Sequence, residues 1–288
     1  MKRFSLLYGV LPAAFFLFSL CFPDRAGEAV LSRTVFFITK VFPTLFLSLC
    51  LSGMLVTSPL AKKLYQYPFG VEGTVFLLGV LCGFPVGARS AVQLYQAGEI
   101  TKRRAEFLCG FSNLASAPFL LGVVGSSLFG KTDLGWRFIA LQTVCALLTA
   151  GVLYLCLRPA CPGVSAVPAA ERPLLSHVTS ATRTLAEVGG MLIFFGTAGE
   201  CAASLLHLSG IPAVLLAAFF EFSAGCGSGA ALGGRAGELL AALSVGFSGL
   251  CVLGQVSAVT KGKLSLLPYV GGKVIQTALM GALFFLFT

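Results

Sequence analysis

The sequence predicts an all-α integral membrane protein with about seven transmembrane helices, two re-entrant helical hairpins and an inverted repeat. Composition is the first indication: 11% of the 288 residues are charged and 57% are hydrophobic, whereas soluble domains carry about 25% charged residues. The second is that apolar runs long enough to cross a bilayer recur along the chain. The third is a pair of apolar runs interrupted in the middle. We therefore expect a lipid bilayer as the main solvent.

Seven apolar segments are the candidate membrane spans. In order they are Phe4–Phe22, Thr34–Val56, Ala105–Leu128, Arg137–Leu157, Leu185–Leu206, Leu239–Val259 and Pro268–Phe287. The first segment follows two basic residues and lacks a small-residue cleavage site at its end. We interpret it as an uncleaved span and not as a signal peptide.

Two further apolar stretches, Val71–Ala97 and Ile211–Gly234, contain breaks. The first break is Gly83–Gly87, with Pro85 inside it, and the second is the Gly-rich run Ser223–Gly229. Each half is only about 9 to 13 residues, which is too short to cross a membrane. A backbone break at membrane depth is tolerated where protein or a water-filled cavity surrounds it. We therefore predict two re-entrant hairpins.

Basic residues between the apolar runs predict the orientation of the chain. They cluster at Lys2 and Arg3, Lys62 and Lys63, Lys102 to Arg104, and Lys261 and Lys263. All four clusters lie on the cytoplasmic side if the N-terminus is inside and both hairpins return to the side they entered from. The C-terminus is then outside. Because the clusters are short and lie between spans, the net charge of +9 indicates orientation and not nucleic-acid binding.

The spans divide a single membrane domain into two repeats. Residues 1–29 hold the first span and a loop, residues 30–157 form repeat one, residues 158–184 form a linker rich in proline, and residues 185–288 form repeat two. An offset of 132 residues places Glu106 on Glu238 and Ser112 on Ser244. Each repeat has an odd number of spans, so the two have opposite topology. Interrupted helices in an inverted repeat are typical of secondary transporters.

Four polar clusters are the candidate substrate site. The first hairpin tip carries Pro85, Gly87 and Arg89, where free N–H groups and a guanidinium suit an anion; a guanidinium that extends to the interface is the alternative. The break within the third predicted span carries Ser112, Asn113 and Ser116, with polar contact between helices as the alternative. The second tip offers Ser223 and Ser228, and the related break in repeat two offers Ser248 and Gln255.

Glu221 and Glu200 are the candidates for ion coupling. An ionisable residue at membrane depth is costly and indicates function. Glu221 could hold a cation, carry a proton or pair with Arg89, and structural pairing is the alternative for both residues. We expect no catalytic group, no cofactor and no metal site, because the sequence has no catalytic triad or phosphate-binding loop and its ten cysteines are scattered without metal spacing.

A set of short motifs occurs along the chain. In order they are GFPVGAR at residues 83–89, Gly98–Thr101, Phe111–Asn113 with Pro118, Glu221–Gly225, Gly246–Gly249 with Gln255, and Pro268–Tyr269 with Lys273. In order and spacing this set resembles the nucleoside-recognition (Gate) domain membrane proteins, and within them the YlbJ-type sporulation integral membrane proteins. The resemblance implies a fold similar to the core of concentrative nucleoside transporters. The sporulation branch implies export of dipicolinic acid from the mother cell toward the forespore.

The expected function is transport of a small polar, anionic metabolite, with dipicolinic acid first. A nucleoside or related solute is an alternative substrate. A non-transporting membrane factor for spore or envelope maturation is an alternative class, and an intramembrane enzyme is the weakest. Expected partners are the substrate and the bilayer, with a coupling proton or sodium ion and a second copy of the chain as further candidates. The expected location is the bacterial cytoplasmic membrane or the outer forespore membrane.

Overall fold

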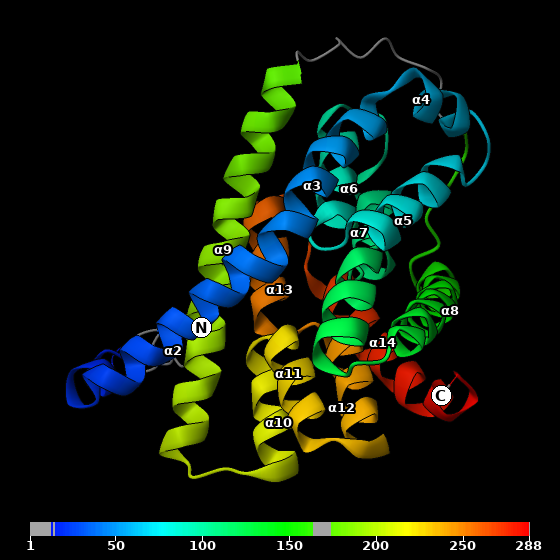
Figure 1. Ribbon diagram of the computed structural model, residues 1–288. Helices are drawn as coiled ribbons and strands as arrows, with labels where there is room; N and C mark the ends of the chain where they lie inside the picture. Colours follow the sequence, from blue (N-terminus) through cyan, green and yellow to red (C-terminus); the bar gives the residue numbers. More distant parts are fainter. Residues whose placement is uncertain (1–12, 14, 164–173, 288) are drawn as a thin grey trace, which may run out of the picture.

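The computed structural model describes residues 13, 15–163 and 174–287, and all regular secondary structure in this part is helical (Figure 1). In chain order the elements are α2 (Pro23–Phe36), η1 (Phe37–Val41, a π-helical turn), α3 (Phe42–Thr57), α4 (Pro59–Tyr65), α5 (Gly70–Cys82), α6 (Val86–Gln96), α7 (Lys102–Phe111), η2 (Phe119–Leu128, π-helical), α8 (Thr132–Leu157), α9 (Leu174–Leu205), α10 (Gly210–Phe220), α11 (Phe222–Leu232), α12 (Gly234–Phe247), α13 (Gly249–Thr260) and α14 (Leu267–Phe287).

Five helical segments of the described chain are long and apolar enough to cross a membrane. They are Pro23–Val56, Thr132–Leu157, Leu175–Leu205, Gly234–Thr260 and Leu267–Phe287, and each overlaps a predicted span. Large apolar side chains cover their outer faces, among them Leu155, Leu175 and Leu286, each more than 70% exposed. Such a surface suits lipid and not water, so the protein is a helical integral membrane protein.

The other two predicted spans have different outcomes. Most of Phe4–Phe22 lies outside the described residues. The segment Ala105–Leu128 is not one helix, because α7 ends at Phe111 and η2 begins only at Phe119. Ser112 to Ser116 form an irregular segment between them. The amide side chain of Gln142 on α8 replaces the missing helical partners at this break: Nε2 donates to the carbonyl of Ala115 (2.9 Å), and Oε1 accepts from its N–H (3.0 Å).

The first interrupted stretch forms two short helices, α5 and α6, joined by Gly83 to Pro85. The start of α5 lies beside the linker, where the N–H of Phe69 donates to the carbonyl of Cys161. Helices α5 and α6 pack against each other. Glu99, just after α6, lies near Lys62 of α4, the helix that precedes α5, so the pair begins and ends on the same side. Burial raises the pKa of Glu99, and the Lys62 charge partly offsets that rise. The stretch is therefore a helical hairpin, and its re-entry into a membrane stays a prediction.

The second interrupted stretch also forms two helices, but its break was predicted at the wrong place. The chain breaks at Glu221 alone, and the Gly-rich run that follows is part of helix α11. Close packing explains two of its three glycines, because a Cβ atom would lie 2.5 Å from the hydroxyl of Ser244 at Gly225 and 2.8 Å from the carbonyl oxygen of Gly237 at Gly229. Small residues let helices in lipid approach closely, so here they indicate packing and not a turn.

The linker is also shorter than expected. Helix α9 begins at Leu174, within the range 158–184 assigned to the linker. The polar Ser and Thr residues at its start return hydrogen bonds to the helix itself, as the hydroxyl of Thr184 does to the carbonyl of Ser180. These bonds explain how a polar stretch continues an apolar helix.

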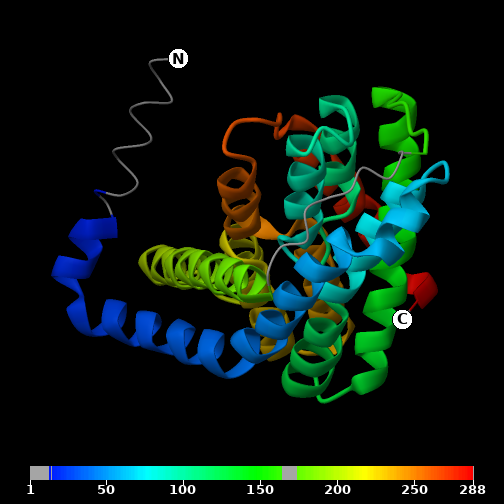
Figure 2. The same cartoon turned by 90° about the horizontal axis from the view of Figure 1, so that it is seen from above.

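Three of the four predicted basic clusters, at residues 62–63, 102–104 and 261–263, lie in described residues, and they gather at one end of the molecule (Figure 1). Glu106 accepts a hydrogen bond from the N–H of Ser265 (2.8 Å), which joins the first part of α7 to the α13–α14 loop. At the opposite end Lys131 pairs with Glu238 (2.7 Å). In the view from above, α2 extends away from the helix bundle and lies against α9 (Figure 2). Which end faces the cytoplasm stays a prediction.

Candidate binding site

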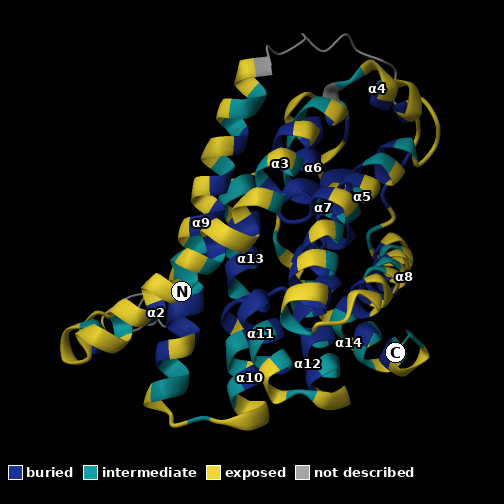
Figure 3. Ribbon diagram, viewed as in Figure 1, coloured by how far each residue is buried: buried dark blue, intermediate teal, exposed yellow. Residues whose placement is uncertain are grey.

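A small cavity lies where the two hairpin tips meet the helix breaks. Most residues of this central part of the helix bundle are buried (Figure 3). Its polar lining comes from Ser116 at the first break, Glu221 and Ser223 at the second tip, and Gln255 on α13. The cavity offers about 30 Å³ to the centres of water molecules, which is room for a very few waters. Four of the predicted site residues, drawn from both halves of the chain, therefore share one volume.

Glu221 is both a wall of this cavity and the cap of helix α11. Its side chain is fully buried and accepts hydrogen bonds from the N–H groups of Ser223 (3.0 Å) and Ala224 (2.8 Å), and from the hydroxyl of Ser223. A carboxylate at a helix N-terminus also gains from the helix dipole. Glu221 therefore does have a structural role, which was the alternative to ion coupling. Its partners are the N-terminus of α11 and not Arg89.

Gln255 brings an unused acceptor to the cavity. Its Nε2 donates to the sulfur of Cys251 (3.3 Å), while its Oε1 is buried and has no hydrogen-bond partner among the described residues. A buried polar atom without a partner is costly. A water molecule or a ligand donor in the cavity would satisfy this oxygen.

Aromatic rings form the apolar walls. The ring of Phe222 packs against Phe84 of the first tip, with centroids 5.3 Å apart, and against Phe119 of η2 at 5.2 Å. All three rings line the cavity. Walls of this kind pack well against a flat ring, edge on or offset.

Four predicted residues hold the first tip to the first break and do not line the cavity. Asn113 accepts the N–H of Ala88 at its Oδ1 (2.9 Å), so this amide at the start of α6 is already occupied. Gly87 lies so close to Ser112 that a Cβ atom would be 2.4 Å from its carbonyl oxygen. Pro85 precedes the first residue of α6 and is buried. These contacts position the tip.

The remaining predicted residues lie elsewhere. Arg89 donates to the hydroxyl of Ser180 on α9 and does not line the cavity. Glu200 is 47% exposed and pairs with Arg33 (3.2 Å). Ser228 lies on α11 beyond the cavity residues, and Ser248 forms the left-handed break between α12 and α13 (φ 70°). The structure therefore does not bring these four side chains to the cavity.

Lys273 on α14 is a buried charged residue that was not among the predicted site residues. It is 3% exposed, and its ammonium donates to the carbonyl of Asn113 (2.6 Å) and to Oε1 of Gln276 (2.9 Å). It also lies 5.1 Å from the centroid of the Phe84 ring. The signal was available, because Lys273 is a lone charge within a predicted span.

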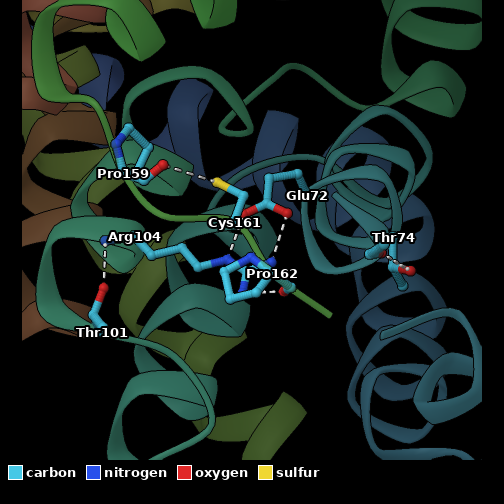
Figure 4. A network of polar contacts seen from close by, with 8 residues as sticks. Glu72, Thr74, Thr101, Arg104, Pro159, Cys161 and Pro162 are labelled. Atoms are coloured by element: carbon cyan, nitrogen blue, oxygen red, sulfur yellow. Dashed lines mark hydrogen bonds and ion pairs between the residues drawn. The ribbon is translucent and has the colours of Figure 1, made fainter. Parts of the chain in front are cut away.

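Arg104 is a second charge whose position the sequence did not reveal. It was assigned to a basic loop cluster, yet it is 2% exposed and forms a two-pronged ion pair with Glu72 of α5, at 2.6 and 2.8 Å (Figure 4). Its third nitrogen donates to the carbonyl of Pro162 (2.9 Å). Beside it, burial and then the Glu72 charge raise the pKa of Cys161 to about 12, so this thiol is unreactive at neutral pH. The network ties the linker to the first hairpin.

The fold and cavity define a helical integral membrane protein with a small cavity between interrupted helices, mostly apolar in lining but carrying four polar residues. No family model matches the chain, and no solved structure matches it. Among curated proteins it is similar to the sporulation integral membrane protein YlbJ of Bacillus subtilis (strain 168), with 29% identity over 141 residues. That match covers 44% of this chain and 34% of the relative, so the chain spans about a third of the length of the protein it matches.

Proposed function

We propose that the protein is a membrane transporter of a small polar metabolite and that it acts in sporulation. The observation that carries this proposal is the small cavity between the helix breaks, whose four polar residues come from both halves of the chain. A site between helix breaks near the middle of a bundle is the common arrangement in secondary transporters. The relative's name supports the sporulation setting, and transport is our own inference.

The substrate class follows from the walls of the cavity. Three aromatic rings favour a flat ring, while the Gln255 oxygen and Glu221 favour hydrogen-bond donors or a cation. An aromatic carboxylic acid such as dipicolinate satisfies the rings, and Glu221 is then the site for a coupling proton or sodium ion. A nucleoside also presents a flat ring and several donors, which keeps it as the second candidate.

The cavity is too small for either candidate substrate in this conformation. Its roughly 30 Å³ admits water but no molecule with an aromatic ring. Transport therefore requires the two hairpin tips to separate, as lids and gates do in other proteins. The Phe84–Phe222 contact between the tips is the contact that must open.

The test is counterflow in liposomes that contain the purified full chain. Liposomes loaded with unlabelled dipicolinate or uridine should accumulate the labelled solute, while protein-free liposomes should not. Ser223→Ala removes a hydroxyl bonded to Glu221 and should lower the rate at least about fivefold. Ser228→Ala makes the same change on the same helix outside the cavity and should leave the rate within about twofold.

Absence of flux for both solutes, by a protein that remains folded and inserted, would contradict transport. It would favour the alternative of a non-transporting factor for spore maturation. Equal effects of the two serine variants would show that the cavity is not the route.

A further inference from the structure

The ammonium of Lys273 is a buried charge that the described core does not neutralise. Its two hydrogen-bond partners, the Asn113 carbonyl and the Gln276 amide oxygen, are uncharged. No carboxylate of the described residues lies within ion-pair distance of it. A buried charge without a counterion is costly, and such residues in membrane proteins mark ligand or ion pathways.

Two unpartnered polar atoms flank Lys273 on the same helix. Tyr269 lies four residues before it and Gln276 three residues after, so the three side chains share one face of α14. The hydroxyl of Tyr269 and Nε2 of Gln276 are buried and have no hydrogen-bond partner among the described residues. Both side chains are at most 2% exposed. The face therefore presents an ammonium and two further donors that lack an acceptor.

One aromatic ring connects this face to the cavity. The Phe84 ring lies 5.1 Å from the Lys273 ammonium and also lines the cavity. A cation over a ring is favourable, so Phe84 compensates part of the charge while no anion is bound. Because Phe84 belongs to the hairpin tip, the same movement that opens the cavity would move this ring.

We propose that Lys273, with Tyr269 and Gln276, forms a subsite that binds a carboxylate of the transported molecule after the Phe84 ring moves aside. The subsite rests on the proposed function and gives its substrate class, an anionic aromatic acid. In this proposal Lys273, and not Arg89, binds the anion, because Arg89 contacts Ser180 outside the cavity. A purely structural Lys273 would instead only donate to the Asn113 carbonyl, which lies just beyond the end of α7.

The test compares two ligands of equal shape and different charge. Dipicolinate and its neutral diamide are titrated against the purified full chain in lipid nanodiscs. Wild type should bind the acid roughly ten- to a hundredfold more tightly than the diamide, as expected for a charged hydrogen bond. Lys273→Gln keeps a donor for Asn113 but loses the charge, and should bring the ratio to within about threefold of one. The exposed control Lys263→Gln should keep the wild-type ratio.

Phe84→Leu gives an independent test that does not disturb the hydrogen bonds of Lys273. Without the ring over the ammonium, the ratio of the affinity for the acid to that for the diamide should rise by about threefold or more. An unchanged ratio in Phe84→Leu, or a wild-type ratio retained by folded Lys273→Gln, overturns the subsite. If wild type binds uridine or the diamide better than the acid, the subsite fails and transport stands, whereas absence of flux for every solute contradicts transport itself.

Discussion

At the scale of single residues, the candidate site is a set of buried polar groups with incomplete hydrogen bonding. Glu221 accepts three hydrogen bonds at the start of α11, whereas Gln255, Tyr269 and Gln276 each keep one polar atom without a partner among the described residues. Buried polar groups are normally paired. We therefore propose that a ligand or water completes the structure at the unpaired groups.

Glu221→Gln should separate the two roles of this residue. The amide oxygen can still accept from one N–H of α11, so the protein should insert and fold, with a loss of stability near that of a weakened cap, about 0.5–2 kcal/mol. The loss of charge should abolish the dependence of flux on proton or sodium gradients. Flux measured in liposomes across a range of pH and sodium concentrations checks this. An unchanged gradient dependence would assign Glu221 to the helix cap alone.

At the scale of elements, the first hairpin is held by close backbone contact with the first break. A Cβ atom on Gly79 of α5 would lie 2.0 Å from the carbonyl oxygen of Ser112, whereas one on Gly73 of the same helix would meet nothing within 4 Å. Close packing therefore requires a glycine at position 79 but not at position 73, although both lie inside one helix.

Gly79→Ala should push the hairpin away from the break and destabilise the protein by about 1–3 kcal/mol, the usual effect of overpacking. Gly73→Ala makes the same change in open space and should stabilise α5 by about 0.5–1 kcal/mol. Thermal unfolding of both variants in one detergent gives the comparison. Equal shifts in the two melting temperatures would mean that the hairpin does not pack on Ser112.

The buried Arg104–Glu72 pair joins α7, α5 and the linker. Arg104→Met leaves the Glu72 carboxylate buried without a partner, and breaking such a pair should cost about 3–5 kcal/mol. The neighbouring Arg103 is exposed, and Arg103→Met should change stability by less than about 0.5 kcal/mol. Unfolding curves of the two variants decide the point, and a mild effect of Arg104→Met would place its guanidinium in solvent.

At the scale of the whole molecule, the three described basic clusters, at residues 62–63, 102–104 and 261–263, lie at one end of the helix bundle (Figure 1). This arrangement predicts that cysteines introduced at Lys62 and Lys102 label from the cytoplasmic side and one at Arg235 from the other side. The measurement uses a membrane-impermeant thiol reagent on intact cells and on inverted vesicles, in a background without the native cysteines. Labelling of Lys62 and Lys102 from opposite sides would make the first hairpin a full span.

Composition and hydropathy determined the membrane class, because too few charged residues exist to cover a surface in water. Pattern also located five of the spans and the interruptions near Gly83 and Ser112, since proline, glycine and clustered polar residues interrupt helices locally. These features depend on neighbours in the chain and are visible without the fold.

Only the tertiary structure decided which polar residues share a cavity. Ser116 and Gln255 meet there while Arg89 and Glu200 point elsewhere, and Lys273 contacts the first break from the far end of the chain. In the sequence, a glycine such as Gly229 is equally consistent with a turn and with a close contact between helices. The choice depends on which helix lies opposite, and that is a property of packing between segments distant in sequence.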